Sequence, residues 1–169
     1  MTDGNSADET AFTDWSVEFG VTEVCLVGTM EDSLRYELLS RETAREALAT
    51  YDLREPYPNT LALHTVSLGA AVALLNDLNW YLVRFAAAAL VREPEISTTE
   101  WLSRDLAEAV RDERIDPEET GRYRRQYNVI DGELAEPIPL SGDERASADE
   151  RGEIEDTLVV RVTEAEFDG

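Results

Sequence analysis

The stretch SLGAAVALLNDLNWYLVRFAAAALV, residues 67 to 91, decides whether this chain folds in water or spans a membrane. A transmembrane helix needs about 20 consecutive and predominantly apolar residues. Asn76, Asp77, Asn79 and Arg84 interrupt the stretch from its middle onward, and charged side chains inside a bilayer are costly and rare. We therefore predict that the stretch fills the core of a protein that folds in water and does not enter a membrane.

The two halves of this stretch carry different secondary-structure signals. Ser67 is a good N-cap, and the apolar residues after it recur at helical spacing, which predicts a helix of about a dozen residues. From Trp80 the residues change to strand formers, so that WYLVRF and ALVRE are predicted to be two strands joined by an alanine-rich turn. The stretch is thus predicted to form a helix followed by a β-hairpin.

The segments on the N-terminal side of this stretch also alternate between strand and helix patterns. TEVCLVGT (22–29) and LRYELL (34–39) both show strand character, and the short connection between them predicts a hairpin. Ser40 can cap a helix that extends to Tyr51. TLALHTV (60–66) is apolar on both faces of the pleat, which predicts a strand in the interior of a sheet.

The segments on the C-terminal side contain a helix signal and a hairpin signal. Residues 97–100, Ser-Thr-Thr-Glu, form a capping box that predicts a helix with Leu102 and Leu106 on its buried stripe and Trp101 at the margin. Further on, YNVI-DG-ELAE predicts a β-hairpin with its turn at residues 131–132, Asp-Gly.

These segments together predict an α+β fold. We expect a single compact domain over residues 22–140, with a mixed or antiparallel sheet of about five to seven strands and three to four helices. Residues 1–21 are predicted to form an acidic, mostly disordered arm, and residues 141–156 an acidic linker with too few apolar side chains to order itself. Residues 157–169 are predicted to add a strand to the sheet or to remain a free tail.

The charge of the chain is its most informative global property. Aspartate and glutamate number 37 against 15 basic residues, the net charge is −22, and every basic residue is arginine. Near molar salt the Debye length falls to roughly 3 Å, so that the repulsion is screened while the carboxylates keep the surface hydrated. We interpret the composition as that of an extreme halophile; the alternative is an acidic interaction protein from an ordinary cell. With Cys25 as the single cysteine and no secretory signal at the start, we expect a cytoplasmic protein.

The residue types that metal and nucleotide sites require are scarce. Cys25 and His64 are too few for a zinc site, and neither a GxxxxGK[ST] loop nor a GxGxxG motif after a strand is present. We therefore predict no metal and no cofactor. Cys25 and His64 both lie in predicted strands and could meet as nucleophile and base, but the pattern favours two ordinary core residues.

Two groups of residues are candidates for interaction with a partner. In GRYRRQY (121–127), the residues Arg122, Tyr123, Arg124 and Arg125 could contact phosphates and stack on bases, or could end a short helix that starts after Asp116. The other group comprises Trp80, Arg84 and Trp101, whose aromatic rings and guanidinium group are typical of protein interfaces.

Three sequence blocks resemble an uncharacterised family of small haloarchaeal proteins with no assigned function. The blocks are LRYELLSRETAREALATYDLREPY, TVSLGAAVALLNDLNWYLVRF and EWLSRDLAEAV, and the resemblance covers roughly residues 22–140. It implies a haloarchaeal source, in agreement with the charge, and it brings no catalytic residue with it. The alanine run after Phe85 departs from the more polar turn of the family, which puts the conformation of that turn in doubt.

Three classes of function follow from these observations. We favour a non-enzymatic adaptor or regulatory domain that binds another protein, supported if Trp80 or Trp101 lies in an exposed apolar patch. The alternative is a nucleic-acid or phosphate-binding protein that uses the Arg122–Arg125 cluster. An enzyme of an unrecognised type comes third, and it would need a pocket with convergent polar groups around His64.

Overall fold

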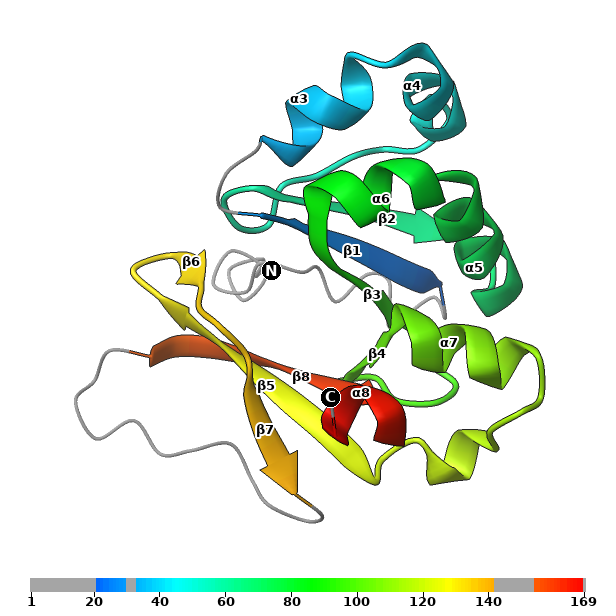
Figure 1. Cartoon of the computed structure of the whole chain (residues 1–169), viewed down its shortest axis with the longest axis vertical. Coiled ribbons are helices and arrows are strands. Elements are labelled where there is room, and N and C mark those ends of the chain that lie inside the picture. The colour runs from blue at the N-terminus through cyan, green and yellow to red at the C-terminus, as the bar shows by residue number, and fades with distance from the viewer. Residues whose placement is uncertain (1–20, 30–32, 142–153, 169) are drawn as a thin grey trace, which may run out of the picture.

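A computed structural model of the chain describes residues 21–29, 33–141 and 154–168. Its eight strands form one curled, mixed sheet in the order β2-β1-β3-β4-β8-β5-β6, and β7 also pairs with β5 (Figure 1). The pair β4–β8 is parallel, whereas the other strand pairs of the described residues are antiparallel. The strands are β1 Thr22–Gly28, β2 Thr60–Thr65, β3 Ala86–Arg92, β4 Trp101–Ser103, β5 Tyr123–Ile130, β6 Glu133–Leu134, β7 Ile138–Ser141 and β8 Ile154–Val162.

Six α-helices and one 3-10 turn accompany the sheet in the described part of the chain. The predicted α+β class with a mixed sheet is therefore confirmed, with more strands than the five to seven expected and more helices than the three to four expected. None of the helices within residues 21–29, 33–141 and 154–168 is long and apolar enough to cross a membrane. The helices are α3 Leu34–Leu39, α4 Glu42–Leu48, α5 Leu68–Asp77, α6 Asn79–Phe85, α7 Arg104–Arg111 and α8 Glu164–Asp168, and the 3-10 turn is η1 Pro117–Glu119.

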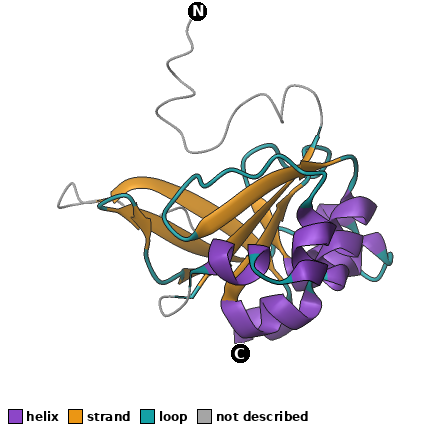
Figure 2. Ribbon diagram, turned by 90° about the horizontal axis from the view of Figure 1, so that it is seen from above, coloured by secondary structure: helices purple, strands orange, loops and turns teal. Residues whose placement is uncertain are grey.

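Helices α3 to α7 cover one face of the β2-β1-β3 part of the sheet, where the main core lies (Figure 2). Because side chains alternate along a strand, every second residue of β1 and β2 points toward these helices. Leu26 and Leu61 on the strands and Leu75 on α5 are fully buried there. Complete burial of one such side chain stabilises the fold by about 1.5–3 kcal/mol.

The opposite face of the sheet carries a second apolar cluster. Cys25, Leu90, Trp101 and Val160 belong to it and are buried. Trp101 and Val160 are paired across the parallel β4–β8 contact, so their side chains lie on one face. This second cluster connects the β1-β3 part of the sheet, which is covered by helices α3 to α7, with the β8-β5 part, against which α8 packs.

The segment after the predicted linker contributes a central strand. β8 lies between β4 and β5, with Trp101 of β4 opposite Val160 and Tyr127 of β5 opposite Leu158. Of the two possibilities for residues 157–169, docking on the sheet is the one that the structure has. The predicted acidic arm, 1–21, and the predicted linker, 141–156, lie largely outside the described residues.

Several predicted elements are confirmed. β1, β2 and α5 occupy their predicted positions, and the Ser67 hydroxyl accepts a hydrogen bond from Ala70 N at 3.0 Å as an N-cap should. The hairpin of β5 and β6 turns at Asp131 and Gly132, whose φ angles of 55° and 81° are those of a type I′ turn. β2 is, however, an edge strand and not an interior one, although Arg54 adds one bridge to Ala62 on its outer side.

Two predicted hairpins are wrong, because tertiary packing overrides local strand preference. LRYELL forms helix α3, capped by Ser33, so it is no partner of β1; the proposed turn at 30–32 lies outside the described residues. WYLVRF lies in helix α6, and the alanine run is not a turn but the first half of β3. The alanine residues are accepted in β3 because pairing with β1, and not intrinsic strand preference, sets the conformation.

The predicted helices after residue 97 are also corrected. Ser97 caps only a turn, accepting from Glu100 N at 3.0 Å, and the helix itself begins after Ser103, whose hydroxyl accepts from Leu106 N. Trp101 is therefore a buried strand residue and not the margin of a helix. In place of the helix predicted after Asp116, the structure has only the short 3-10 turn η1. Of the arginines that follow, Arg124 and Arg125 lie in strand β5 and Arg122 directly precedes it.

Candidate functional site

Helix α6 presents an exposed aromatic and aliphatic surface. Trp80 is 49% exposed and Val83, three residues later on the same side of the helix, is 69% exposed, while Leu82 faces the core. Trp80 also packs edge-on against Tyr81, with ring centroids 5.1 Å apart. The helix thus buries one side and leaves a large indole in solvent on the other.

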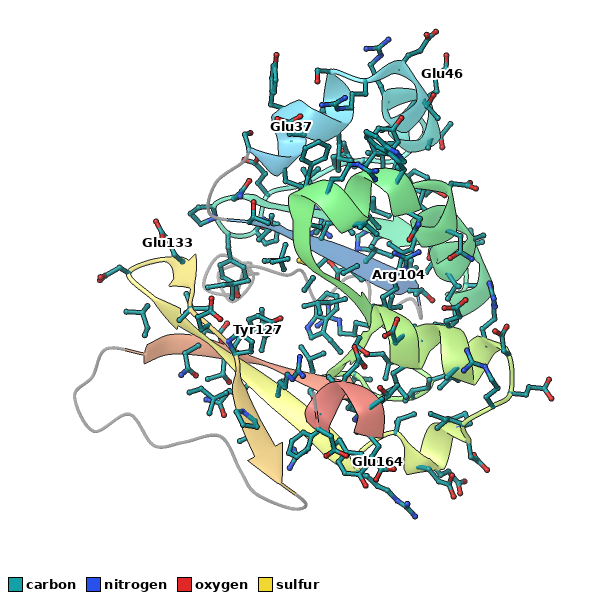
Figure 3. The ribbon with its side chains drawn as sticks, in the orientation of Figure 1. Glu37, Glu46, Arg104, Tyr127, Glu133 and Glu164 are labelled. Atoms are coloured by element: carbon teal, nitrogen blue, oxygen red, sulfur yellow. The ribbon has the colours of Figure 1, made fainter. Side chains whose placement is uncertain are left out.

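Two arginines lie over this indole ring. The Arg84 guanidinium is 3.7 Å from the Trp80 ring centroid, and its Nη1 donates to the Trp80 carbonyl at 2.8 Å. Arg41, which follows α3, is 5.9 Å from the Trp80 ring and 5.0 Å from the Phe85 ring. Arg41 also pairs with Glu37 at 3.0 Å, a residue labelled on α3 in Figure 3. We call Trp80, Val83, Arg84 and Arg41 the Trp80 surface.

The arginine cluster that we considered for nucleic acid is divided between two faces of β5. Tyr123 and Arg125 point to one face and Arg124 to the other, as alternation in a strand requires, while Arg122 precedes the strand and is exposed. Tyr123 packs on Phe167 with centroids 5.4 Å apart. The four side chains therefore form no common surface for a phosphate backbone.

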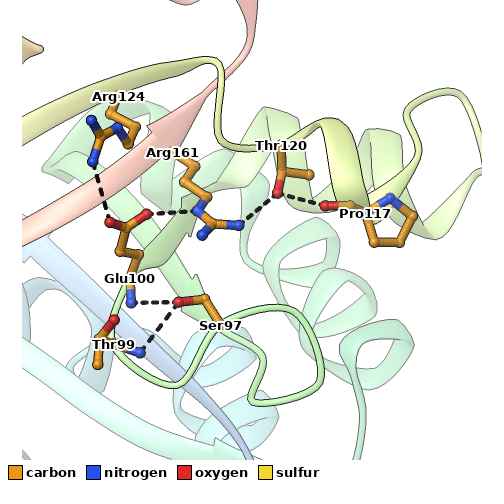
Figure 4. A network of polar contacts seen from close by, with 7 residues as sticks. All are labelled: Ser97, Thr99, Glu100, Pro117, Thr120, Arg124 and Arg161. Carbon is orange, nitrogen blue, oxygen red and sulfur yellow. Dashed lines mark hydrogen bonds and ion pairs between the residues drawn. The ribbon is translucent and has the colours of Figure 1, made fainter. Parts of the chain in front are cut away.

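Arg124 belongs instead to a structural ion network around Glu100. Glu100 receives Arg161 Nε at 2.7 Å and Arg124 Nη1 at 3.3 Å (Figure 4). Arg161 Nη1 also donates to Thr120 Oγ1 at 2.9 Å, and Thr120 in turn donates to the carbonyl of Pro117. These contacts fasten the η1 turn and the segment before β4 to strands β5 and β8.

A second ion network, which the sequence did not reveal, lies on the opposite face of the sheet. Glu23 of β1 is completely buried, and its two carboxylate oxygens each accept from one arginine at 2.5 Å, Arg54 and Arg92. Arg92 also lies 5.0 Å from the centroid of the Trp101 ring. His64, opposite Glu23 on β2, places Nε2 3.8 Å from the carboxylate and 3.3 Å from Arg54 Nη2.

Cys25 and His64 come close in the fold without forming a reactive pair. Cys25 pairs with Ala62, so His64 is its diagonal neighbour on the same face of the sheet. Burial, and to a lesser extent the Glu23 charge, raises the pKa of the Cys25 thiol far above its usual range, so the thiol stays protonated. Burial lowers the pKa of His64, against the opposing effect of Glu23. An activated nucleophile is thus not formed by these two residues.

The comparisons with known proteins identify the family of the chain. Residues 22–129 match the family model DUF5804, a family of unknown function, and the chain belongs to it. The matched part starts at β1 and ends within β5, so that the central strand β8 lies beyond it. No curated protein and no solved structure matches the chain.

The sequence indicated part of this arrangement. Trp80 and Arg84 were selected correctly as neighbours, but on a strand instead of a helix, and Arg41 was missed because it comes from a distant segment. A single acid inside the apolar run TEVCLVG was the available signal for a buried ion pair at Glu23. Its partners Arg54 and Arg92 depend on strand pairing, which no local pattern reveals.

Proposed function

We propose that this member of DUF5804 is a non-enzymatic protein-binding module that docks its partner on the Trp80 surface. The observation that carries the proposal is the indole of Trp80, half exposed and held in place by Arg84. Tryptophan and arginine are the residues most enriched among interface positions that dominate binding energy. A side chain fixed before binding loses little conformational entropy when the partner arrives.

The partner that fits this surface is an acidic protein segment with an apolar side chain for the indole. Helix α6 carries Arg84 and no acid, and Arg41 adds a second guanidinium over the same ring. Concentrated salt screens the net charge of −22 at all but the shortest distances, so an acidic partner is attracted mainly by the guanidinium groups that it contacts directly.

The test is a comparison of three tagged proteins in the source organism's extract at high salt, followed by binding measurements with the purified partner. The three are the wild type, Trp80→Ala, and Val66→Ser, a control at a residue that is 91% exposed, lies before α5 and is not part of the Trp80 surface. Loss of a central tryptophan costs about 2 kcal/mol or more, so Trp80→Ala should weaken binding by about 30-fold.

The pattern of losses separates docking on this surface from other contacts. Arg84→Glu should slow association because it reverses the charge that an acidic partner meets first, whereas Val66→Ser should bind like the wild type. Equal affinity of the wild type and Trp80→Ala would show that the partner binds elsewhere.

We also propose that the acid excess is an adaptation to the salt-rich cytoplasm of a haloarchaeon. Its support is the combination of 37 acidic residues with arginine as the only base, together with the screening that concentrated salt provides. Thermal unfolding midpoints should rise between dilute buffer and molar KCl. A midpoint that does not change over this range would contradict the proposal.

A further inference from the structure

A cavity of about 210 Å³ lies beside the first half of β3, away from the Trp80 surface. Its origin is the shortness of β4: the last β4 residue, Ser103, pairs with Leu90, and the chain then turns into α7. Residues 87–89, all alanine, extend beyond this point and fill little space. The other walls come from β5, β8 and α8.

Charged and polar side chains of both signs line this cavity. Arg104, Asp105, Arg125 and Glu166 all contribute to the wall, and no two of them form an ion pair with each other in the described residues; the Arg104 guanidinium donates to Asn76 Oδ1 on α5 at 3.2 Å. Tyr127 of β5 also lines the cavity. Figure 3 labels Tyr127 on β5 and Arg104 at the start of α7, which belong to different walls. Burial raises the pKa of Tyr127, so the hydroxyl is a stable hydrogen-bond donor.

The charged groups are fixed by contacts that leave part of each group available. Arg125 Nη2 donates to the backbone carbonyl of Glu166, so its remaining N–H groups are not used by this contact. Glu166 Oε1 accepts from Ser103 Oγ at 2.6 Å and from Thr163 N at 2.9 Å. Both bonds fall on the same oxygen, and Oε2 stays available as an acceptor. A cation donor and an anion acceptor are thus held in place in one cavity.

We propose that this cavity binds a small zwitterion of the amino-acid type. The carboxylate of the ligand pairs with Arg125, its ammonium group with Glu166 Oε2, and Tyr127 donates to a carboxylate oxygen. A water molecule takes about 30 Å³ in the liquid, so the cavity has room for a molecule of roughly seven non-hydrogen atoms. L-alanine, with a carboxylate and an ammonium group on one carbon, is of this size.

The charge balance of the walls favours a zwitterion over a simple ion. A lone carboxylate would bring its negative charge near Glu166 and Asp105, and a lone amine would bring its positive charge near Arg125. Desolvating one unmatched charge is costly, whereas a ligand with both charges satisfies both walls at once. The α7 N-terminus plays no part in this assignment, because the Glu166 carboxylate already contacts its cap, Ser103.

The test titrates the full chain in molar KCl with L-alanine and with two half-analogues, propionate and ethylammonium, and follows backbone amide NMR shifts. L-alanine should give saturable shifts at residues of β5 and β3 around the cavity. Each half-analogue lacks one charge-assisted hydrogen bond and should bind about tenfold more weakly. Propionate binding as tightly as L-alanine would overturn the zwitterion assignment, and absence of saturable shifts with L-alanine would overturn the site.

Two variants place the carboxylate end of the ligand. Arg125→Gln should weaken L-alanine binding by about tenfold, whereas Arg122→Gln, at an exposed residue outside the cavity, should not change it. Equal binding by the wild type and Arg125→Gln would contradict the role of Arg125. Thermal unfolding of both variants checks that they are folded. If Arg125→Gln does not fold, the comparison of L-alanine with the two half-analogues on the wild type still tests the proposal.

Discussion

Glu23 and Glu100 are each held by two arginines, yet their surroundings differ completely. Glu23 lies on β1, between β2 and β3, with its side chain fully buried, and Glu100 lies before β4 with 22% of its side chain exposed. The Glu23 contacts are also shorter, 2.5 Å to both partners against 2.7 and 3.3 Å around Glu100. The molecule therefore contains the same arrangement of one carboxylate and two arginines twice, once with the carboxylate buried and once with it partly exposed to water.

The difference teaches what an ion pair contributes at each depth. A buried carboxylate is expensive to remove from water, and its arginines repay that cost only while all members are present. A partly exposed pair gains less from the protein, because water and salt ions compete for both charges. We expect the Glu23 network to be fragile to single substitutions and insensitive to salt, and the Glu100 network to show the reverse.

The largest expected effect is that of Glu23→Gln. The amide keeps the shape of the side chain but removes its fully buried charge, leaving Arg54 (29% exposed) and Arg92 (11% exposed) without their counter-ion, which should cost about 3–5 kcal/mol of unfolding free energy. Chemical denaturation at fixed KCl measures the loss. A cost below about 1 kcal/mol would be that of an exposed ion pair, and would contradict the expected difference between the Glu23 and Glu100 networks.

A smaller loss is expected for Glu100→Gln. The Glu100 side chain is 22% exposed, whereas that of Glu23 is completely buried, so water takes over part of the lost interaction. The unfolding free energy should fall by about 1 kcal/mol, measured under the same conditions as Glu23→Gln. If Glu100→Gln were as damaging as Glu23→Gln, depth would not be the variable that separates the two networks.

The pH dependence sharpens the comparison through His64, which lies beside the Glu23 network. Burial lowers the pKa of His64 in the folded state, with Arg54 and Arg92 acting in the same direction. Between this folded value and the unfolded value of about 6.5, the unfolded chain binds more protons, so stability falls as the pH decreases through that window. His64→Asn should flatten the pH profile of the unfolding midpoint below about pH 6.5. An unchanged profile would assign the acid sensitivity to other groups.

The smallest effect concerns salt. Double-mutant cycles for Glu23 with Arg92 and for Glu100 with Arg161 isolate the two pair energies from the general effect of KCl on the chain. The Glu100–Arg161 coupling should decrease by a few tenths of a kcal/mol as KCl rises to molar concentration, while the Glu23–Arg92 coupling stays constant. Parallel salt dependence of both couplings would mean that ions reach Glu23 as well.

The parts of the fold that the sequence predicted are those set by local chemistry. The Ser67 cap, the Asp131–Gly132 turn and the strand character of β1 each depend on a few adjacent residues. WYLVRF became a helix and the alanine run a strand because their neighbours in space, α3 on one side and β1 on the other, decide the outcome. The candidate site was only partly predictable for the same reason, since Arg41 reaches Trp80 from the connection between α3 and α4.

The position of β8 has a consequence for how the sheet can be assembled. Strands β4 and β5 are synthesised before β8, and each offers an unpaired edge in the described sheet until residues 154–162 have left the ribosome. The parallel contact between β4 and β8 also joins residues far apart in the chain, which slows folding. Until β8 has been made, a nascent chain of this protein therefore holds two open half-sheets, a stage at which a chaperone has most to protect.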